Sequence, residues 1–129
     1  MPAPIRVGPS TTPVHLDFNA GEDVDILLEP FDSSDPPQAL FMASAVATIA
    51  LPGGLPLHTW SVGAGNLALQ IGPGDPAHLT QVLLSTTRLE TAAWWSAWGD
   101  AEWQLEVVDV FGQQKRACEG DVRVRQSRR

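Results

Sequence analysis

The side chains that could act as metal ligands or general bases in this chain are few and lie far apart. The three histidines, His15, His58 and His78, do not stand at a spacing such as HExxH that binds zinc. His15 and Asp17 share one face of a predicted strand, which suits a weak surface metal contact but is better explained by exposed polar residues on a half-solvated strand. The sequence therefore predicts no enzyme, no metal site and no cofactor.

Acidic residues and the single cysteine also favour structural over catalytic roles. Glu22, Asp23 and Asp25 gather near a predicted turn, but the spacing of a calcium-binding EF-hand is absent. A charged, solvated sheet edge explains them better, since such edges resist aggregation. Cys118 has no second cysteine to pair with, and we expect it to be a small buried side chain.

Tryptophan is the chemically distinctive residue, with five copies and no tyrosine in the chain. Trp94 and Trp98 would lie one turn apart on a helix, with Trp95 pointing elsewhere. We expect Trp103 to be in the core and at least one of the other three rings to contact another subunit, because tryptophan is enriched in interfaces. The alternative is that these rings form a platform that binds carbohydrate.

Charge is unevenly distributed along this chain of 129 residues, whose net charge is −7. Residues 1–100 hold ten acidic and two basic residues, whereas residues 101–129 hold five acidic and six basic ones. A mostly acidic body argues against nucleic acid as the main partner, because phosphate binding needs a broad basic surface. Arg125, Arg128 and Arg129 form either a solvated end or an arm that docks on an acidic neighbour, for example a second copy.

The N-terminal region has the composition of an extended arm. Residues 1–13 contain four prolines, including Pro2 and Pro4 just before Ile5. We predict an arm that lies on a neighbouring protein rather than a packed element. No apolar run typical of a signal peptide or membrane span is present, so synthesis and residence in the cytosol are expected.

Short alternating segments separated by glycine and proline predict an all-β fold. We expect strands at residues 14–18, 24–29, 43–51, 57–61, 67–71 and 78–84, with the strand at 43–51 buried on both faces. Thr87 and Glu90 are spaced as a capping box that begins one helix, with Leu89, Ala93 and Trp94 along one side of it. Turn signals that recur every 8–12 residues or so indicate a sandwich or small barrel.

Residues 102–125 form the clearest pattern, a β-hairpin with one solvated face. Trp103, Leu105 and Val107 alternate with polar residues, and a turn that contains Gly112 follows. On the return strand we expect one face to carry Arg116, Cys118, Gly120, Val122 and Val124. The other face would carry Lys115, Ala117, Glu119, Asp121, Arg123 and Arg125.

The order of elements over residues 66–125 resembles the small immunoglobulin-like β-sandwich modules of tailed-phage virions, such as the N-terminal domains of baseplate upper proteins. In that type an aromatic strand, a glycine turn and a Gly-x-Val-x-Val strand end the domain, as Trp103, Gly112 and Gly120 to Val124 do here. The resemblance implies an all-β, immunoglobulin-like antiparallel β-sandwich with one short helix and an extended N-terminal arm. It implies no catalytic residues.

These observations lead to one functional expectation and one alternative. Residues 1–13 would be the arm, residues 14–125 the sandwich and residues 126–129 a basic tail. We expect a structural component of a tailed-phage tail, baseplate, neck or head, made in the host cytoplasm and bound to other virion proteins or to copies of itself. The alternative is a carbohydrate- or ligand-binding module. The interface candidates are Trp94, Trp95, Trp98, Arg125, Arg128, Arg129, Pro2, Pro4 and Ile5.

Overall fold

A computed structural model describes residues 5–7, 13–31, 38–51, 56–63, 66–72, 79–95 and 101–125. In chain order the elements are β1 (Ile5–Val7), β2 (Leu16–Asn19), β3 (Val24–Pro30), β4 (Met42–Ala50), β5 (Pro56–Ser61), β6 (Leu67–Ile71), β7 (Leu79–Thr86), α1 (Arg88–Trp95), β8 (Ala101–Asp109) and β9 (Gln114–Arg125). Within these ranges, no helix combines the length and the apolar character needed to cross a membrane.

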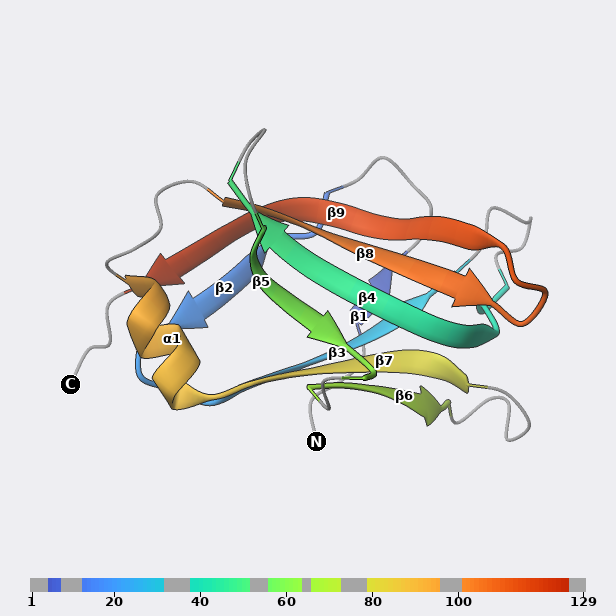
Figure 1. Cartoon of the computed structure of the whole chain (residues 1–129), viewed down its shortest axis with the longest axis horizontal. Coiled ribbons are helices and arrows are strands. Elements are labelled where there is room, and N and C mark those ends of the chain that lie inside the picture. The colour runs from blue at the N-terminus through green and yellow to red at the C-terminus, as the bar shows by residue number, and fades with distance from the viewer. Residues whose placement is uncertain are drawn as a thin grey trace.

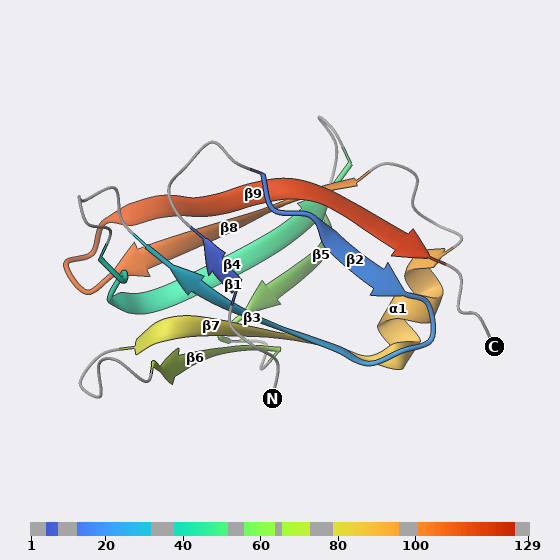
Figure 2. The ribbon, with the colours of Figure 1, turned by 180° about the vertical axis from the view of Figure 1, so that it is seen from behind.

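The strands form two packed sheets with the strand order of an immunoglobulin sandwich (Figure 1). One sheet runs β1-β3-β7-β6 and the other β2-β9-β8-β4-β5. In immunoglobulin lettering these orders are A-B-E-D and A′-G-F-C-C′. The predicted immunoglobulin-like β-sandwich with one short helix is therefore confirmed. The pairings β1–β3 and β2–β9 are parallel, and Figure 2 shows β2 alongside β9.

The core lies between the two sheets and follows the alternation of the strands. In β8, Trp103, Leu105 and Val107 are buried while the residues between them are partly exposed, as the sequence predicts. In β4, however, only one face is buried. Ala47 and Ile49 are inaccessible, whereas the opposite face is partly exposed, so the prediction of a strand buried on both faces is wrong.

Two buried tryptophans tie distant parts of the chain together through their indole N–H groups. Trp60 of β5 donates to the Ser85 carbonyl and to the Thr86 hydroxyl, both at 3.2 Å, and so links an edge strand of one sheet to β7, an inner strand of the other. Trp103 of β8 donates to the Val14 carbonyl at 2.8 Å. Both rings therefore fill the core without leaving their polar atom unsatisfied.

The N-terminal arm is not wholly separate from the domain. Ile5–Val7 forms β1 and pairs with β3 at the edge of the four-stranded sheet. The prediction that residues 1–13 contain no packed element is therefore wrong for this segment. Proline is tolerated beside a short edge strand, because only one side of that strand needs hydrogen-bond donors.

A β-bulge changes the faces of the last strand. The register shifts so that Cys118 lies opposite Leu105 but Arg116 lies opposite Glu106, which leaves Ala117 as the extra residue. Ala117 and Cys118 are consequently both buried, and the predicted grouping of Arg116 with Cys118 is wrong. Burial raises the pKa of the Cys118 thiol to about 12, as suits the small buried side chain that the sequence predicts.

Helix α1 begins with the predicted capping box. The Thr87 hydroxyl accepts from the Glu90 N–H at 3.3 Å, and the Glu90 carboxylate accepts from the Thr87 N–H at 3.0 Å. The Asp23 carboxylate accepts from the Arg88 N–H at 2.7 Å. Three orphan backbone donors at the helix start are therefore satisfied by side chains.

Leu89, Ala93 and Trp94, which were predicted to line one side of α1, differ in their burial. Leu89 is 78% exposed and Ala93 is also exposed, whereas Thr91 and Trp94 are buried. The Thr91 hydroxyl accepts from the Gly21 N–H at 3.0 Å and donates to the Glu22 carbonyl at 2.9 Å. These two hydrogen bonds orient the helix so that Thr91 faces the core and Leu89 faces solvent, although leucine is the more hydrophobic residue.

Candidate protein-interaction site

The turn between β8 and β9 lies at the end of the sandwich opposite α1 (Figure 1). It presents apolar side chains to solvent. Phe111 is 84% exposed and Val110 is 48% exposed. Turns usually carry glycine or small polar residues, which makes these two side chains unusual. We call Val110, Phe111, Gly112 and Gln113 the hairpin tip.

Asp109 holds the hairpin tip in one conformation. Its carboxylate accepts from the backbone N–H groups of Phe111 and Gln113, both at 2.9 Å, and its own N–H donates to the Gln113 carbonyl at 2.9 Å. Gly112 adopts a φ of +84°, which favours glycine, and its N–H donates to the Asp109 carbonyl at 3.0 Å. The tip is therefore ordered before it meets any partner.

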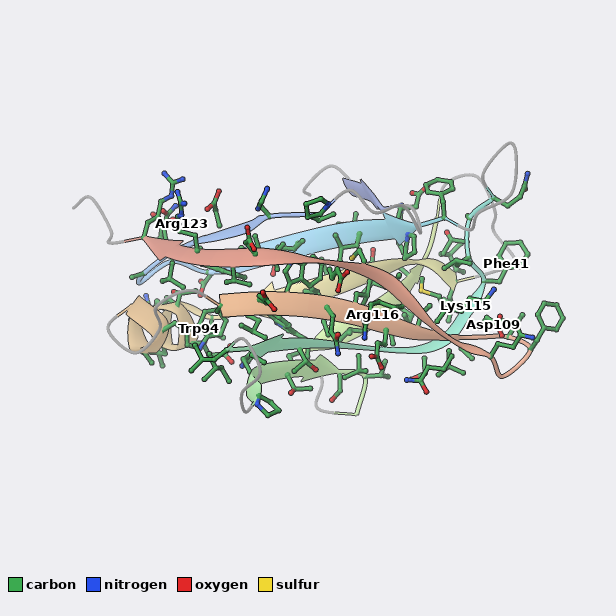
Figure 3. All side chains as sticks on the ribbon, turned by 90° about the horizontal axis from the view of Figure 1, so that it is seen from above. Phe41, Trp94, Asp109, Lys115, Arg116 and Arg123 are labelled. Carbon is green, nitrogen blue, oxygen red and sulfur yellow. The ribbon has the colours of Figure 1, made fainter. Side chains whose placement is uncertain are left out.

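Neighbouring elements support the same turn. The Val110 N–H donates to the Phe41 carbonyl at 3.0 Å, which ties the tip to the segment before β4. Figure 3 shows Phe41, Asp109 and Lys115 at this end of the molecule. The exposed phenyl ring of Phe111 is thus presented by a fixed backbone, and little entropy would be lost on contact with a partner.

The Asp109 carboxylate is nearly buried and remains ionised. The hydrogen bond from the Gln113 N–H lowers the pKa of Asp109 below its usual value, against the opposing effect of burial. The Phe111 N–H and the Lys115 ammonium, 3.7 Å from the carboxylate, act in the same direction as Gln113. The acceptor that organises the tip is therefore charged at neutral pH.

A pocket of about 480 Å³ lies on the solvent-facing side of the five-stranded sheet. Its size is within the range of roughly 300–1,000 Å³ that is typical of ligand pockets. Its lining residues include the apolar residues Pro13, Ala50, Leu51 and Trp103 and the acidic residues Glu102, Glu119 and Asp121. We call this feature the outer-face pocket. It combines apolar walls with three carboxylates.

Residues 13 and 14 run close to β9, and Pro13 lines the outer-face pocket. The Val14 N–H donates to the Glu119 carbonyl at 2.9 Å, and the Val14 carbonyl accepts from Trp103. This close approach requires glycine at position 120, because a Cβ atom there would clash with the Val14 carbonyl. The close approach of this segment to β9, next to the pocket residue Pro13, thus depends on Gly120.

The carboxylates of the outer-face pocket repel one another. Glu102 of β8 and Asp121 of β9 lie directly opposite in the antiparallel ladder, and both are exposed. Like charges at such positions are destabilising. The His15 Nδ1 lies 3.4 Å from the Asp121 carboxylate. Among the residues that the structure describes, no group of three or more His, Cys, Asp or Glu side chains is placed to hold a metal ion.

The structure places Trp94 in the core rather than at an interface. Its ring is 6% exposed and meets Phe18 at 5.1 Å, Trp60 at 6.3 Å and His58 at 4.9 Å between ring centroids. A ring so enclosed has almost no area left for a partner or a sugar. Figure 3 shows Trp94 at the end of the sandwich that carries α1, far from Asp109.

The other predicted interface residues fall into two groups. Arg125 ends β9, and its guanidinium lies 3.7 Å from the Asp17 carboxylate. Ile5 pairs in register with Leu28 of the same chain. The remaining predicted interface residues lie outside the described part of the chain; they are Pro2, Pro4, Trp98, Arg128 and Arg129. For Trp95 the structure describes the backbone but not the side chain. Of the members that the structure describes, Trp94 lies in the core, Arg125 at the end of β9 and Ile5 in β1 at the edge of the other sheet.

The hairpin tip and the outer-face pocket were not predicted as sites from the sequence. The signal for the tip is the pair Val110-Phe111 inside a turn that Gly112 marks. The pocket has no comparable signal, because Leu51, Glu102 and Asp121 come together only through strand pairing.

Comparison with known proteins adds only a distant likeness of fold. No family model matches the chain, and no curated protein matches its sequence. Among solved structures, the chain is similar to the crystal structure of CopC from Methylosinus trichosporium OB3b. The TM-score is 0.45 and the sequence identity 10%, over 88% of each chain. This likeness concerns the β-sandwich arrangement and carries no argument about the site.

Proposed function

We propose that this chain is a structural assembly module that binds other proteins through the hairpin tip. The observation that carries the proposal is Phe111, an aromatic side chain that is 84% exposed on a turn held by Asp109. Rigid aromatic anchors dominate protein interfaces, because they bury a large area at a small entropic cost. The proposed role is one of contact rather than of catalysis.

The proposed context is a tailed-phage particle, in which the partners are other virion structural proteins. The resemblance of residues 66–125 to immunoglobulin-like virion modules supports this context. The chain would be made in the host cytoplasm and would take its place in the tail, baseplate, neck or head. The alternative, carbohydrate binding by Trp94, Trp95 and Trp98, is weakened because the Trp94 ring is buried and cannot stack on a sugar.

Incorporation into particles tests the proposal. In cells that produce the particle, tagged wild-type chain should sediment with purified particles, whereas Phe111→Ser should be depleted. Loss of a central aromatic anchor costs about 2 kcal/mol or more, which is roughly thirtyfold in affinity. Leu89→Ser is the matched control, because Leu89 is 78% exposed on α1, away from the hairpin tip.

Two results would count against the proposal in different ways. Absence of the wild-type chain from particles would refute the proposed context. Equal incorporation of Phe111→Ser and wild type would show that the hairpin tip is not the contact. Circular dichroism of both variants checks that each remains folded.

A further inference from the structure

Leu27 is buried although it lies on the outward face of the four-stranded sheet. Successive residues of a strand point to opposite faces, and the neighbours of Leu27, Ile26 and Leu28, belong to the hydrophobic core. Leu27 therefore points away from the other sheet and is not part of that core, yet it is only 3% exposed. Something other than the facing sheet must cover it.

Outward apolar residues elsewhere in the molecule show that flanking strands alone do not give such burial. Val46 of β4 and Val108 of β8 lie on inner strands of the five-stranded sheet, and both remain partly exposed. Leu83, which lies opposite Leu27 on the inner strand β7, is partly exposed as well. Leucine is larger than valine, so an uncovered Leu27 should be at least as accessible as these residues.

Gln81 of β7 is a second outward residue that is buried. Its neighbour Val82 belongs to the core, so Gln81 points outward, and it is 5% exposed. Its amide Nε2 donates to the carboxylate of Glu29 on β3 at 2.9 Å, two residues along the strand from Leu27. A cover that reaches from β3 to β7 accounts for the burial of both Leu27 and Gln81.

The register of β1 indicates which part of the chain supplies this cover. β1 runs parallel to β3, and Ile5 lies opposite Leu28 (Figure 2). The residues that precede Ile5 therefore begin beside Leu27. We infer that residues 1–4 fold over the outward face of the four-stranded sheet and cover Leu27. This inference goes beyond the proposed function, because it concerns the sheet that does not contain the hairpin tip.

Length and composition suit residues 1–4 to this place. Four extended residues span about 13 Å, whereas β1 and β7 lie about 10 Å apart on either side of β3. The sequence Met-Pro-Ala-Pro is apolar, and its two prolines have no N–H to leave unpaired when the chain departs from the strand ladder. Methionine fills irregular apolar gaps well. The cover belongs to the same chain, because Leu27 is buried in a single copy.

Thiol labelling of the full chain tests the inference. Leu27→Cys should react slowly with a water-soluble thiol reagent, and deletion of residues 2–4 should speed the reaction at least roughly tenfold, because an uncovered site is open to the reagent. Native Cys118 adds little background, since it is buried and its pKa is raised to about 12. Ala68→Cys is the matched control on the same face, because Ala68 is exposed and its cysteine should react fast with or without residues 2–4.

Val82→Cys separates loss of the cover from loss of the fold. Val82 is inaccessible in the core, so its cysteine should react slowly in both forms of the chain. Equal rates for Leu27→Cys with and without residues 2–4 would refute the inference. Acceleration of Val82→Cys by the same factor as Leu27→Cys would also refute it, because residues 2–4 would then support the whole fold. Labelling of Leu27→Cys that slows as protein concentration rises would identify a second copy as the cover instead.

Discussion

Gly120 shows how a single residue without a side chain shapes this molecule. Its missing Cβ lets the backbone of Val14 come close to β9 and accept the indole N–H of Trp103, while the preceding residue, Pro13, lines the outer-face pocket. A side chain at this position would push the Val14 backbone away. The core and the pocket therefore depend on the same glycine.

Gly120→Ala should lower the free energy of unfolding by about 1–3 kcal/mol, as is usual when a packed site must expand. The Val14 backbone would have to move, and its hydrogen bond with Trp103 would weaken. Urea denaturation measures the change. Gly63→Ala is the matched control, because a Cβ atom there meets nothing within 4 Å. Equal midpoints for the two variants would contradict the prediction.

His58 is a titratable residue inside the aromatic cluster. Its ring lies 4.6 Å from Trp60 and 4.9 Å from Trp94 between centroids, and its Nδ1 is 3.6 Å from the Glu90 carboxylate. Its Nε2 is buried without a hydrogen-bond partner among the described residues. Burial lowers the pKa of His58 below 6.5, and the attraction of Glu90 offsets this only in part.

This pKa shift makes stability depend on pH. Because the unfolded chain takes up a proton on His58 more readily than the folded one, stability is full above about pH 6.5 and is lost as pH falls towards the folded pKa. We expect the free energy of unfolding to decrease from about pH 7 to about pH 5. Asp109 does not contribute to this window, because its pKa is lowered from 3.8.

Chemical denaturation at several pH values checks the prediction. His58→Phe should flatten the pH dependence of the wild type, because the buried imidazole is removed. His15→Gln is the control, since the His15 side chain is 65% exposed. If wild type and His58→Phe keep the same slope, the buried histidine does not set the pH dependence.

At the scale of the element, α1 is a short helix whose start is well defined. Its eight residues are too few for a stable isolated helix, so caps and core contacts must hold it. Thr87 and Glu90 cap each other, and the other carboxylate oxygen of Glu90 faces His58. The capping interaction therefore also positions the Glu90 carboxylate beside His58 of the aromatic cluster.

Thr87→Ala should destabilise the protein by about 1 kcal/mol, the usual cost of removing a helix cap. The Glu90 N–H would lose its acceptor. Thermal unfolding followed by circular dichroism measures the loss. Arg88→Ala is the control, because the cap at that residue uses its backbone N–H and leaves the side chain exposed. A smaller effect for Thr87→Ala than for Arg88→Ala would exclude a capping role.

Local patterns predicted most of the elements correctly, and non-local contacts explain the failures. The alternation through Trp103, Leu105 and Val107 defines β8, and the spacing of Thr87 and Glu90 defines the start of α1. The bulge at Ala117 was not predictable, because it depends on which residues of β8 lie opposite. The buried side of α1 depends on Thr91 meeting a turn about 70 residues earlier in the chain.

The candidate site was harder to predict from the sequence than the fold. Phe111 could be recognised as an unusual turn residue, but its exposure depends on Asp109 folding the turn outward. Trp94 attracted attention because of its type, yet its place beside Phe18 and Trp60 is a tertiary contact. Residue type alone does not distinguish a core aromatic from an interface aromatic.

At the scale of the whole molecule, the N-terminal region contributes to both sheets. β1 adds to the edge of one sheet and β2 to the edge of the other, and both pair in parallel with strands that lie later in the chain. Such pairings add long-range contacts, which slow folding.

The position of β9 within its sheet determines when that sheet can be completed. β9 lies between β8 and β2, although it is the last strand in sequence. A growing polypeptide on the ribosome that has not yet reached Gln114 leaves both neighbours with an open edge, which is a template for aggregation. The nascent chain can therefore complete the five-stranded sheet only after Arg125 has been synthesised. We expect chaperones to bind the nascent chain mainly before that point.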